Sequence, residues 1–282
     1  MEKVGIIVDS TFYFTKEEIK KYDLGVVQLN VIDGEVSHKE YDLTPEIVYK
    51  RQDEGAGLTT SQPSPQEFID AYTEGFEKGY EKLLVLTLSK GLSGTYQSAA
   101  LAKKSHERGD DVYLVDTQQA AYGNGLLTLL TIEKLKKAKD LETFVKDVEQ
   151  MGQDIGLFFT VENLNSLYRG GRLKRSQAFI GTVLRVKPML TVKEGKLTLF
   201  DKSRSYSGVN QKIIDYMKED QTGKKNLVGR MITINSEDSY APLKEAVLAA
   251  FPNATFSETT YLGPVFSIHV GKKGYGLAWY FE

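Results

Sequence analysis

The order of apolar and polar positions predicts alternating strands and helices in the first half of the chain. Short continuous apolar runs occur at Val4–Val8, Leu83–Leu88 and Val112–Val115, and each has the length of a buried parallel strand. After each run come polar turn residues and then a helical pattern, as in the helix expected from about Asn124 to Lys137. This alternation through residue 140 predicts a doubly wound, mainly parallel sheet with helices on both faces.

Helix-start signals divide the region between the first two of these runs. The sequences Thr15–Glu18 and Ser64–Glu67 both match a capping box, in which a hydroxyl group and a glutamate satisfy the first amides of a helix. Gly25–Val31 is expected to form one strand. Gly55–Pro63 is rich in hydroxyl groups and is expected to be a loop just before the second capped helix.

The pattern changes after Asp140, where hairpins replace the strict alternation of strand and helix. Sequential strands joined by short turns predict a mixed or antiparallel sheet that carries helices. We therefore expect an α/β chain of two domains, with an N-terminal α/β domain at 1–152 and a C-terminal α/β domain at 153–282. The main elements expected in the second domain are strands at Ile155–Val161, Leu227–Ile234 and Val265–Val270, helices at Lys174–Arg185, Val209–Lys218 and Ala241–Phe251, and a hairpin at Met189–Phe200.

Composition narrows the class of protein. The chain has 282 residues, 41% hydrophobic side chains and a formal net charge of -2, which suits a globular protein and gives no global signal for nucleic-acid binding. Cysteine is absent, so disulfides and thiolate metal sites are excluded. No apolar run approaches the ~20 residues that a membrane span requires, and the N-terminus lacks a signal-peptide layout. We expect a cytoplasmic monomer that uses no metal and no cofactor.

The turn after Leu83–Leu88 is the first candidate site. Ser93 and Thr95 lie where a buried strand gives way to a helix, and the unpaired amides of a helix N-terminus attract a carboxylate or a phosphate. Capping of that helix by Ser93 is the commoner role of such a serine and explains the same residues. In a parallel sheet this turn lies at the carboxyl edge, which is where ligands bind.

His269 is the second candidate. If Val265–Val270 is a strand, Ser267 and His269 lie on the face opposite its apolar residues. A half-exposed histidine without a function explains this pattern as well. None of the three histidines has a partner at metal-ligand spacing, so we expect no zinc site.

Catalytic motifs are incomplete. Ser93 followed by His269 has the chain order of an α/β-hydrolase, but Gly91–Thr95 has threonine where the second glycine of G-x-S-x-G belongs. Neither a Walker-type phosphate loop nor a G-x-G-x-x-G after a strand is present, so an ATP site has no support. The basic stretch Arg169–Arg175 is either a solvated helix end or a docking point for an acidic group.

The ordered set of motifs resembles the DegV family of bacterial fatty-acid-binding proteins over essentially the whole chain. Each motif is short, but seven in the same order make a chance similarity improbable. They are IIVDST at 6–11, TTSQPSP at 59–65, LSKGLSGTYQSA at 88–99, VDTQQAAYGNG at 115–125, ENLNSLYRGGRL at 162–173, VKPML at 186–190 and SIHVGKKGYG at 267–276.

This resemblance implies that a long-chain fatty acid lies in an apolar tunnel between the two domains. It also implies that two hydroxyl groups and the histidine near the C-terminus hold the carboxylate, and that the chain itself is not an enzyme. The residues expected at this site are Thr60, Ser61, Ser93, Gly94, Thr95 and His269.

The resemblance further implies a protein partner. A separate fatty acid kinase would phosphorylate the bound carboxylate, with Arg172 and Arg204 on the surface that faces the kinase. A transient membrane contact is compatible with such a carrier. The chain departs from the family at Lys272–Lys273, where a proline and a glycine are usual, so the family's geometry is not carried over to the turn after His269.

Two other functions stay open at this point. One is a serine hydrolase that acts on acyl esters through Ser93 and His269. The other is a sensor of small anions, which would need a compact polar pocket in place of a long apolar one.

Overall fold

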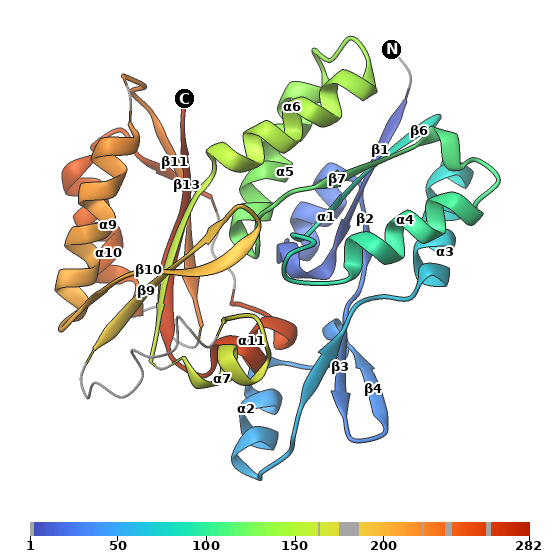
Figure 1. Ribbon diagram of the computed structural model, residues 1–282. Helices are drawn as coiled ribbons and strands as arrows, with labels where there is room; N and C mark the ends of the chain where they lie inside the picture. Colours follow the sequence, from blue (N-terminus) through green and yellow to red (C-terminus); the bar gives the residue numbers. More distant parts are fainter. Residues whose placement is uncertain (1–2, 163, 175–185, 222, 235–238, 258–260) are drawn as a thin grey trace.

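The strands of the protein form three sheets, which we call A, B and C (Figure 1). The computed structural model describes residues 3–162, 164–174, 186–221, 223–234, 239–257 and 261–282. Within these residues no helix is long and apolar enough to cross a membrane.

Sheet A is parallel throughout, and helices cover both of its faces, as predicted. Its strands, in spatial order, are β2 (Leu24–Val27), β1 (Val4–Asp9), β6 (Lys82–Thr87) and β7 (Val112–Asp116); its helices are α1 (Lys16–Tyr22), α3 (Pro65–Glu77), α4 (Thr95–Ser105), α5 (Tyr122–Leu135) and α6 (Leu141–Asp154). Along β6, Leu83 and Val85 share a core with α3 and α4, whereas Leu84 and Leu86 share one with α5. Both predicted capping boxes form, at the starts of α1 and α3.

Sheet B is a small antiparallel sheet that the sequence did not predict. It has the order β4 (Val36–Lys39), β3 (Asn30–Asp33), β5 (Thr59–Ser61), and α2 (Pro45–Asp53) lies between β4 and β5 in the chain. The single strand expected at Gly25–Val31 is wrong, because its two ends pair in different sheets as β2 and β3. The loop expected at Gly55–Pro63 is wrong at its centre, because β5 pairs with β3 there.

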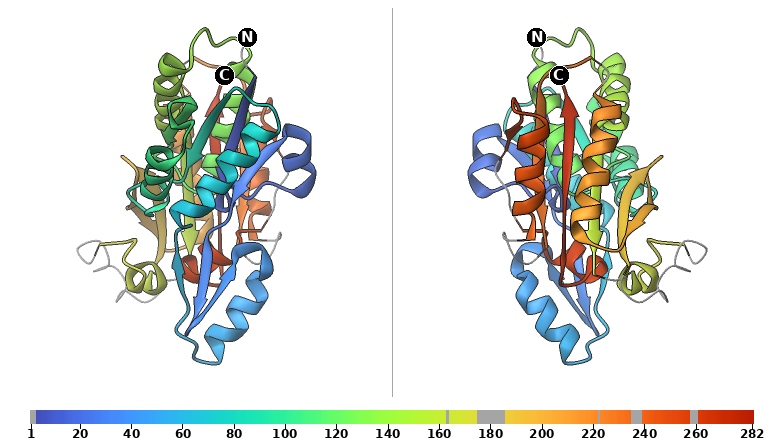
Figure 2. Two further views of the ribbon diagram at one scale, coloured as in Figure 1. Left: turned by 90° about the vertical axis from the view of Figure 1, so that its right-hand side faces the viewer. Right: turned by 90° about the vertical axis from the view of Figure 1, so that its left-hand side faces the viewer.

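Sheet C is mixed, as predicted. In spatial order it contains β10 (Lys196–Ser203), β9 (Lys187–Lys193), β8 (Gly156–Val161), β13 (Gly274–Phe281), β11 (Leu227–Thr233) and β12 (Thr255–Phe256). All its pairs are antiparallel except β11 with β12. The helices α9 (Tyr206–Asp220) and α10 (Ala241–Ala250) pack on one face around the buried Trp279. In this strand order β13 lies near the middle of the sheet, between β8 and β11 (Figure 2).

The strand predicted at Val265–Val270 is a helix, α11 (Pro264–Val270). Proline at the first helical position fits a helix start, and burial of Val265, Ile268 and Ser267 follows helical spacing. In seven residues an alternating pattern and a helical pattern share most of their apolar positions, which is why the sequence was misleading. The helix predicted at Lys174–Arg185 lies almost entirely outside the described residues.

The three sheets surround one central region of the molecule. In Figure 1, sheet A lies at the upper right, sheet C at the left, and sheet B with α2 at the bottom. Between sheets B and C lie α11 and the short helix α7 (Asn165–Arg169). The domain boundary predicted at residue 152 falls within the last turn of α6.

Candidate functional site

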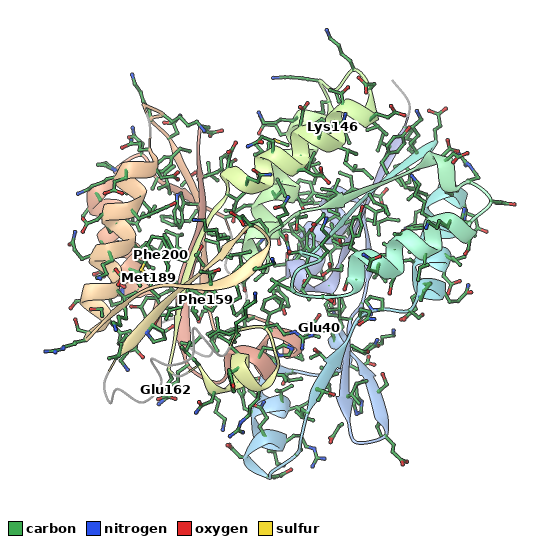
Figure 3. All side chains as sticks on the ribbon, viewed as in Figure 1. Glu40, Lys146, Phe159, Glu162, Met189 and Phe200 are labelled. Atoms are coloured by element: carbon green, nitrogen blue, oxygen red, sulfur yellow. The ribbon has the colours of Figure 1, made fainter. Side chains whose placement is uncertain are left out.

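An apolar cavity lies in this central region and has a volume of about 60 Å³. Its walls come from distant parts of the chain: Leu29, Leu88 and Leu92 on one side, and Phe159 (Figure 3), Val192 and Leu197 of sheet C on another. The polar residues on its lining are Thr60, Ser61, Gln62, Ser93, Arg172 and His269. Four of the predicted site residues thus line a single cavity.

Thr60 and His269 meet at the polar part of this cavity. The Oγ1 atom of Thr60 lies 2.9 Å from Nε2 of His269, and the two atoms are hydrogen-bonded. Thr60 is placed by β5, where it stands opposite Val31 of β3. His269 is placed by α11, and residues 60 and 269 are brought together by the packing of sheet B against that helix.

Side chains of α2 fix α11 from the other side. The hydroxyl of Tyr49 donates to Ser267 Oγ at 3.2 Å, and Nε2 of Gln52 donates to the carbonyl of Ile268 at 3.5 Å. Ser267 is completely buried and donates to the carbonyl of Leu262. The wrong strand prediction had put Ser267 on the same face as His269, whereas the helix turns it into the core.

The imidazole of His269 is held in its neutral form. Burial, and after it the positive charge of Arg172, lowers the pKa of His269 to about 4. Its Nδ1 atom is buried and has no hydrogen-bond partner among the described residues. Gly170 packs so closely that a Cβ atom there would lie 2.5 Å from Nδ1, so a side chain at this position would displace the ring.

Ser93 lies in the turn between β6 and α4, where its hydroxyl group has two interactions. Its Oγ atom is hydrogen-bonded to Thr95 Oγ1 at 2.9 Å and accepts from the amide of Thr95 at 3.3 Å. Ser93 therefore supports the first turn of α4 and lines the cavity as well. Thr95 is fully buried behind Ser93, and Gly94 packs against Gln62; neither lines the cavity.

These pairings bear on the hydrolase alternative. Ser93 is bonded to Thr95 and His269 to Thr60, so neither hydrogen bond joins the serine to the histidine. A serine nucleophile needs a base within hydrogen-bond reach, and this arrangement gives the hydrolase no support.

Two aspartates hold the turn that carries Ser93. Asp9 accepts from the amide of Leu88 at 2.7 Å, and Asp116 accepts from the amide of Lys90 at 3.1 Å. Burial raises the pKa of Asp9 to about 6, against the hydrogen bonds that favour its charged form. The acidic residues at the carboxyl ends of β1 and β7 thus have a structural task, which is to position the loop after β6.

The hairpin of β9 and β10 contacts the same turn from the other half of the chain. Ser89 is fully buried and its hydroxyl donates to the carbonyl of Gly195 at 2.6 Å, at the tip of the hairpin. Val192 and Leu197, on the two strands of the hairpin, form part of the cavity wall. The hairpin therefore closes the cavity on one side and is anchored beside Ser93.

Arg172 lies in the cavity wall and Arg204 does not. The guanidinium of Arg172 donates from Nε to the carbonyl of Leu92 at 3.3 Å and from Nη1 to that of Gly170 at 2.6 Å. Burial lowers the pKa of Arg172, which remains a cation at neutral pH. Arg204 is exposed between β10 and α9. Whether either residue faces a partner stays a prediction.

The lysines that depart from the family pattern are paired with acids. Lys272 forms an ion pair with Asp53 of α2, and Lys273 forms one with Glu162 at 3.4 Å. They tie the end of α11 to its neighbours, and neither lines the cavity.

A second, larger hollow is an open groove of about 560 Å³ along the end of α6 and the outer part of sheet C. Its lining includes Gln118, Phe200 and Tyr216 and none of the predicted site residues. Among the described residues there is also no group of three or more His, Asp or Glu side chains that could hold a metal ion.

Fold and site together define an α/β protein that encloses an apolar cavity with hydroxyl, imidazole and guanidinium groups on its lining. The chain belongs to the DegV family, whose model matches residues 3–282. It is 31% identical to the protein DegV of Bacillus subtilis over 282 residues, covering 99% of each chain.

Solved structures agree with this assignment. A DegV family protein from Thermus thermophilus, whose structure is described as showing fatty acid binding, is 32% identical, with a TM-score of 0.92 over 99% of this chain and 100% of the other. DegV of Bacillus subtilis, described as a fatty acid binding protein, is 28% identical, with a TM-score of 0.86 over the whole of both chains.

Proposed function

We propose that this protein binds a long-chain fatty acid in the central cavity and presents its carboxylate to a separate fatty acid kinase. The observation that carries the proposal is the meeting of Thr60, Ser93, Arg172 and His269 on one apolar-walled cavity. The fatty acid binding described for the relatives from Thermus thermophilus and Bacillus subtilis supports the same ligand class.

The polar groups suit a carboxylate head group. A buried carboxylate without partners is too costly, so its oxygen atoms need donors in the cavity. Thr60 and Ser93 offer hydroxyl groups, His269 offers a neutral imidazole, and Arg172 offers the one kind of cation that stays charged when half buried. A carboxylate would then sit between the hydroxyl groups and the guanidinium.

The acyl chain supplies the affinity. Each buried methylene contributes about 0.8 kcal/mol, so a long chain gains several kcal/mol from an apolar wall. Ligand pockets usually have volumes of about 300–1,000 Å³. The cavity of about 60 Å³ must therefore widen, and the half-buried side chains of Leu92, Val192 and Phe266 are the parts of its wall best able to move.

A kinase would complete the reaction, since the chain has no phosphate-binding loop of its own. In this proposal the carboxylate is phosphorylated to an acyl phosphate while the fatty acid stays in the cavity. Arg172 contacts the head group and Arg204, exposed on the surface, contacts the kinase.

Mass spectrometry of the lipid retained through purification first identifies the natural acid. The lipid is then removed, and titration of the lipid-free protein with that acid measures its affinity. The double variant S93A/H269A should bind it at least tenfold more weakly, because two head-group donors are lost. The control S105A/H38A removes the same residue types outside the cavity and should bind like the wild type. Unchanged binding by S93A/H269A contradicts the proposal.

The two other functions give different results. A small-anion sensor would bind acetate as well as the long-chain acid, and a serine hydrolase would be labelled at Ser93 by a fluorophosphonate. We expect neither.

The kinase step has its own variant. With a fatty acid kinase and ATP, R204A should bind the acid normally yet yield acyl phosphate more slowly than the wild type. Equal rates would remove Arg204 from the partner surface and leave fatty acid binding intact.

A further inference from the structure

The helix that carries His269 is capped by a residue from far away in the chain. α11 begins after Gly263, which has no side chain to satisfy the first amides. The amide of Val265 instead donates to Oε1 of Glu40 at 3.1 Å, and the amide of Phe266 donates to the hydroxyl of Tyr13 at 3.4 Å. Glu40 lies in the short 3-10 helix Glu40–Asp42 that follows β4.

Glu40 is completely buried and lies in the middle of the molecule beside α11 (Figure 3). Besides the amide of Val265, its carboxylate accepts from the hydroxyl groups of Ser10 and Tyr13. Both hydroxyl groups are committed to this role, because Ser10 Oγ already accepts from the amide of Leu29 and Tyr13 Oη from that of Phe266.

In this arrangement all three partners donate to Glu40, and each of the contacts favours its charged form. The hydrogen bonds favour the charged form, against the burial that raises the pKa of Glu40 to about 7. A buried carboxylate with this much committed geometry fixes the position of whatever it holds. What it holds is the first turn of α11.

About one turn of helix separates Val265 from His269. A shift at Val265 is transmitted along so short a helix to the imidazole. The 2.9 Å hydrogen bond between His269 and Thr60 is sensitive to such a shift, because hydrogen bonds weaken steeply with poor geometry.

We propose that Glu40 is a positioning residue, whose carboxylate caps α11 and so holds His269 against Thr60 on the lining of the cavity. Glu40 does not line the cavity and touches no ligand there. Its effect on His269 stands on the geometry alone, whereas its effect on ligand affinity rests on the proposed fatty acid binding.

The test variant is E40Q, studied at pH 8. Glutamine keeps an oxygen acceptor but replaces the other by an amide that donates, so Ser10 or Tyr13 loses its acceptor. The main readout is the NMR signal of the His269 ring, assigned by its absence in H269Q. We expect its chemical shift at pH 8 to differ from that of the wild type, and the affinity for a long-chain fatty acid to fall on the order of tenfold.

V247A is the control for a general loss of stability. Val247 is completely buried in α10 against sheet C, in a core that does not include α11. V247A should lower the melting temperature while leaving the His269 signal and the affinity unchanged. If E40Q does not fold, Y13F removes one member of the same cap and keeps the charge of Glu40, and a smaller change in the same direction is expected.

The outcomes separate this proposal from the proposed function. The positioning role is overturned if folded E40Q shows the wild-type His269 signal, or if folded Y13F does so where E40Q does not fold. It is also overturned if V247A changes the His269 signal as much as E40Q does. A changed signal in a protein that binds no fatty acid supports the positioning role and contradicts the ligand.

Discussion

Cross-linking the tip of the β9–β10 hairpin tests whether the cavity widens on that side. A Cβ atom built on Gly195 would lie 3.7 Å from Cβ of Gln118, within the range of about 3.5–4.5 Å found in disulfides, and 2.6 Å from Oγ of Ser89, whose side chain must shift to make room. The chain has no native cysteine, so Q118C/G195C contains only the two thiols that are meant to pair.

The expected change in stability follows from chain entropy and local strain. The bond closes a loop of about 77 residues, for which the entropy model gives about 4.5 kcal/mol. Residue 195 has a φ of 71°, and a side chain in this left-handed region costs about 1–2 kcal/mol. The reduced variant has the same strain, so oxidation itself should gain about 4.5 kcal/mol and raise the melting temperature of the variant by about 9 °C, whereas the gain over the wild type is smaller by that strain.

The functional assay compares the oxidised and reduced forms of the same variant. Because Val192 and Leu197 belong to the hairpin, fixing its tip should slow the uptake of a long-chain fatty acid and lower the amount taken up. Adding a reductant should restore both. If the oxidised protein is more stable but takes up the acid as fast and as fully as the reduced protein, the hairpin does not move, and our account of how the cavity widens is refuted.

Three further predictions concern the ion pair between Arg230 and Glu18 and the surroundings of His269. R230M and E18Q should each lower the free energy of unfolding by about 3 kcal/mol, because Nη2 of the fully buried Arg230 lies 3.1 Å from Oε2 of the partly buried Glu18. The double variant should lose clearly less than the sum of the two, and urea unfolding measures all three variants. The pKa of His269 lies near 4 in the folded protein and near 6.5 in the unfolded chain. The stability that comes from keeping the ring neutral is therefore complete above pH 6.5 and is lost as the pH falls to about 4. The difference in unfolding free energy between the wild type and H269Q should change by up to about 3 kcal/mol across this window and should be constant above pH 7. G170A should weaken fatty acid binding on the order of tenfold by displacing the His269 ring. G171A has open space around its Cβ and should keep the affinity, although its left-handed backbone should cost about 1–2 kcal/mol of stability. Equal affinities in the two variants would contradict the role given to Gly170.

Local signals in the sequence predicted much of the fold. The buried strand at Leu83–Leu88, the capping boxes at Thr15 and Ser64, and the hairpin turn at Glu194–Gly195 all have short-range causes. Sheet B has one only for its β3–β4 hairpin, which turns at Gly34, whereas Thr59–Ser61 becomes a strand only by pairing with residues about thirty positions earlier. The division at residue 152 and the ligand role of the site residues stay predictions.

The family resemblance implied that Thr60, Ser93 and His269 meet at one site, but the contacts among these residues were not predicted. Nothing in the sequence indicates that Thr60 is bonded to His269, since the segment around His269 is a helix and was predicted as a strand. Glu40 was overlooked because it stands in a polar stretch and looks exposed, yet it is completely buried. A buried charge is recognisable only once its partners, here on two other segments, are in place.

The central place of β13 has a consequence for biosynthesis. While the ribosome is still making residues 274–281, β8 and β11 each expose an edge that only this strand can cover. Uncovered edges pair readily with other chains, so a nascent or prematurely ended polypeptide is prone to aggregate. Stop codons and proteolysis just before Gly274 should therefore yield insoluble protein, even though every residue implicated in ligand binding is already present.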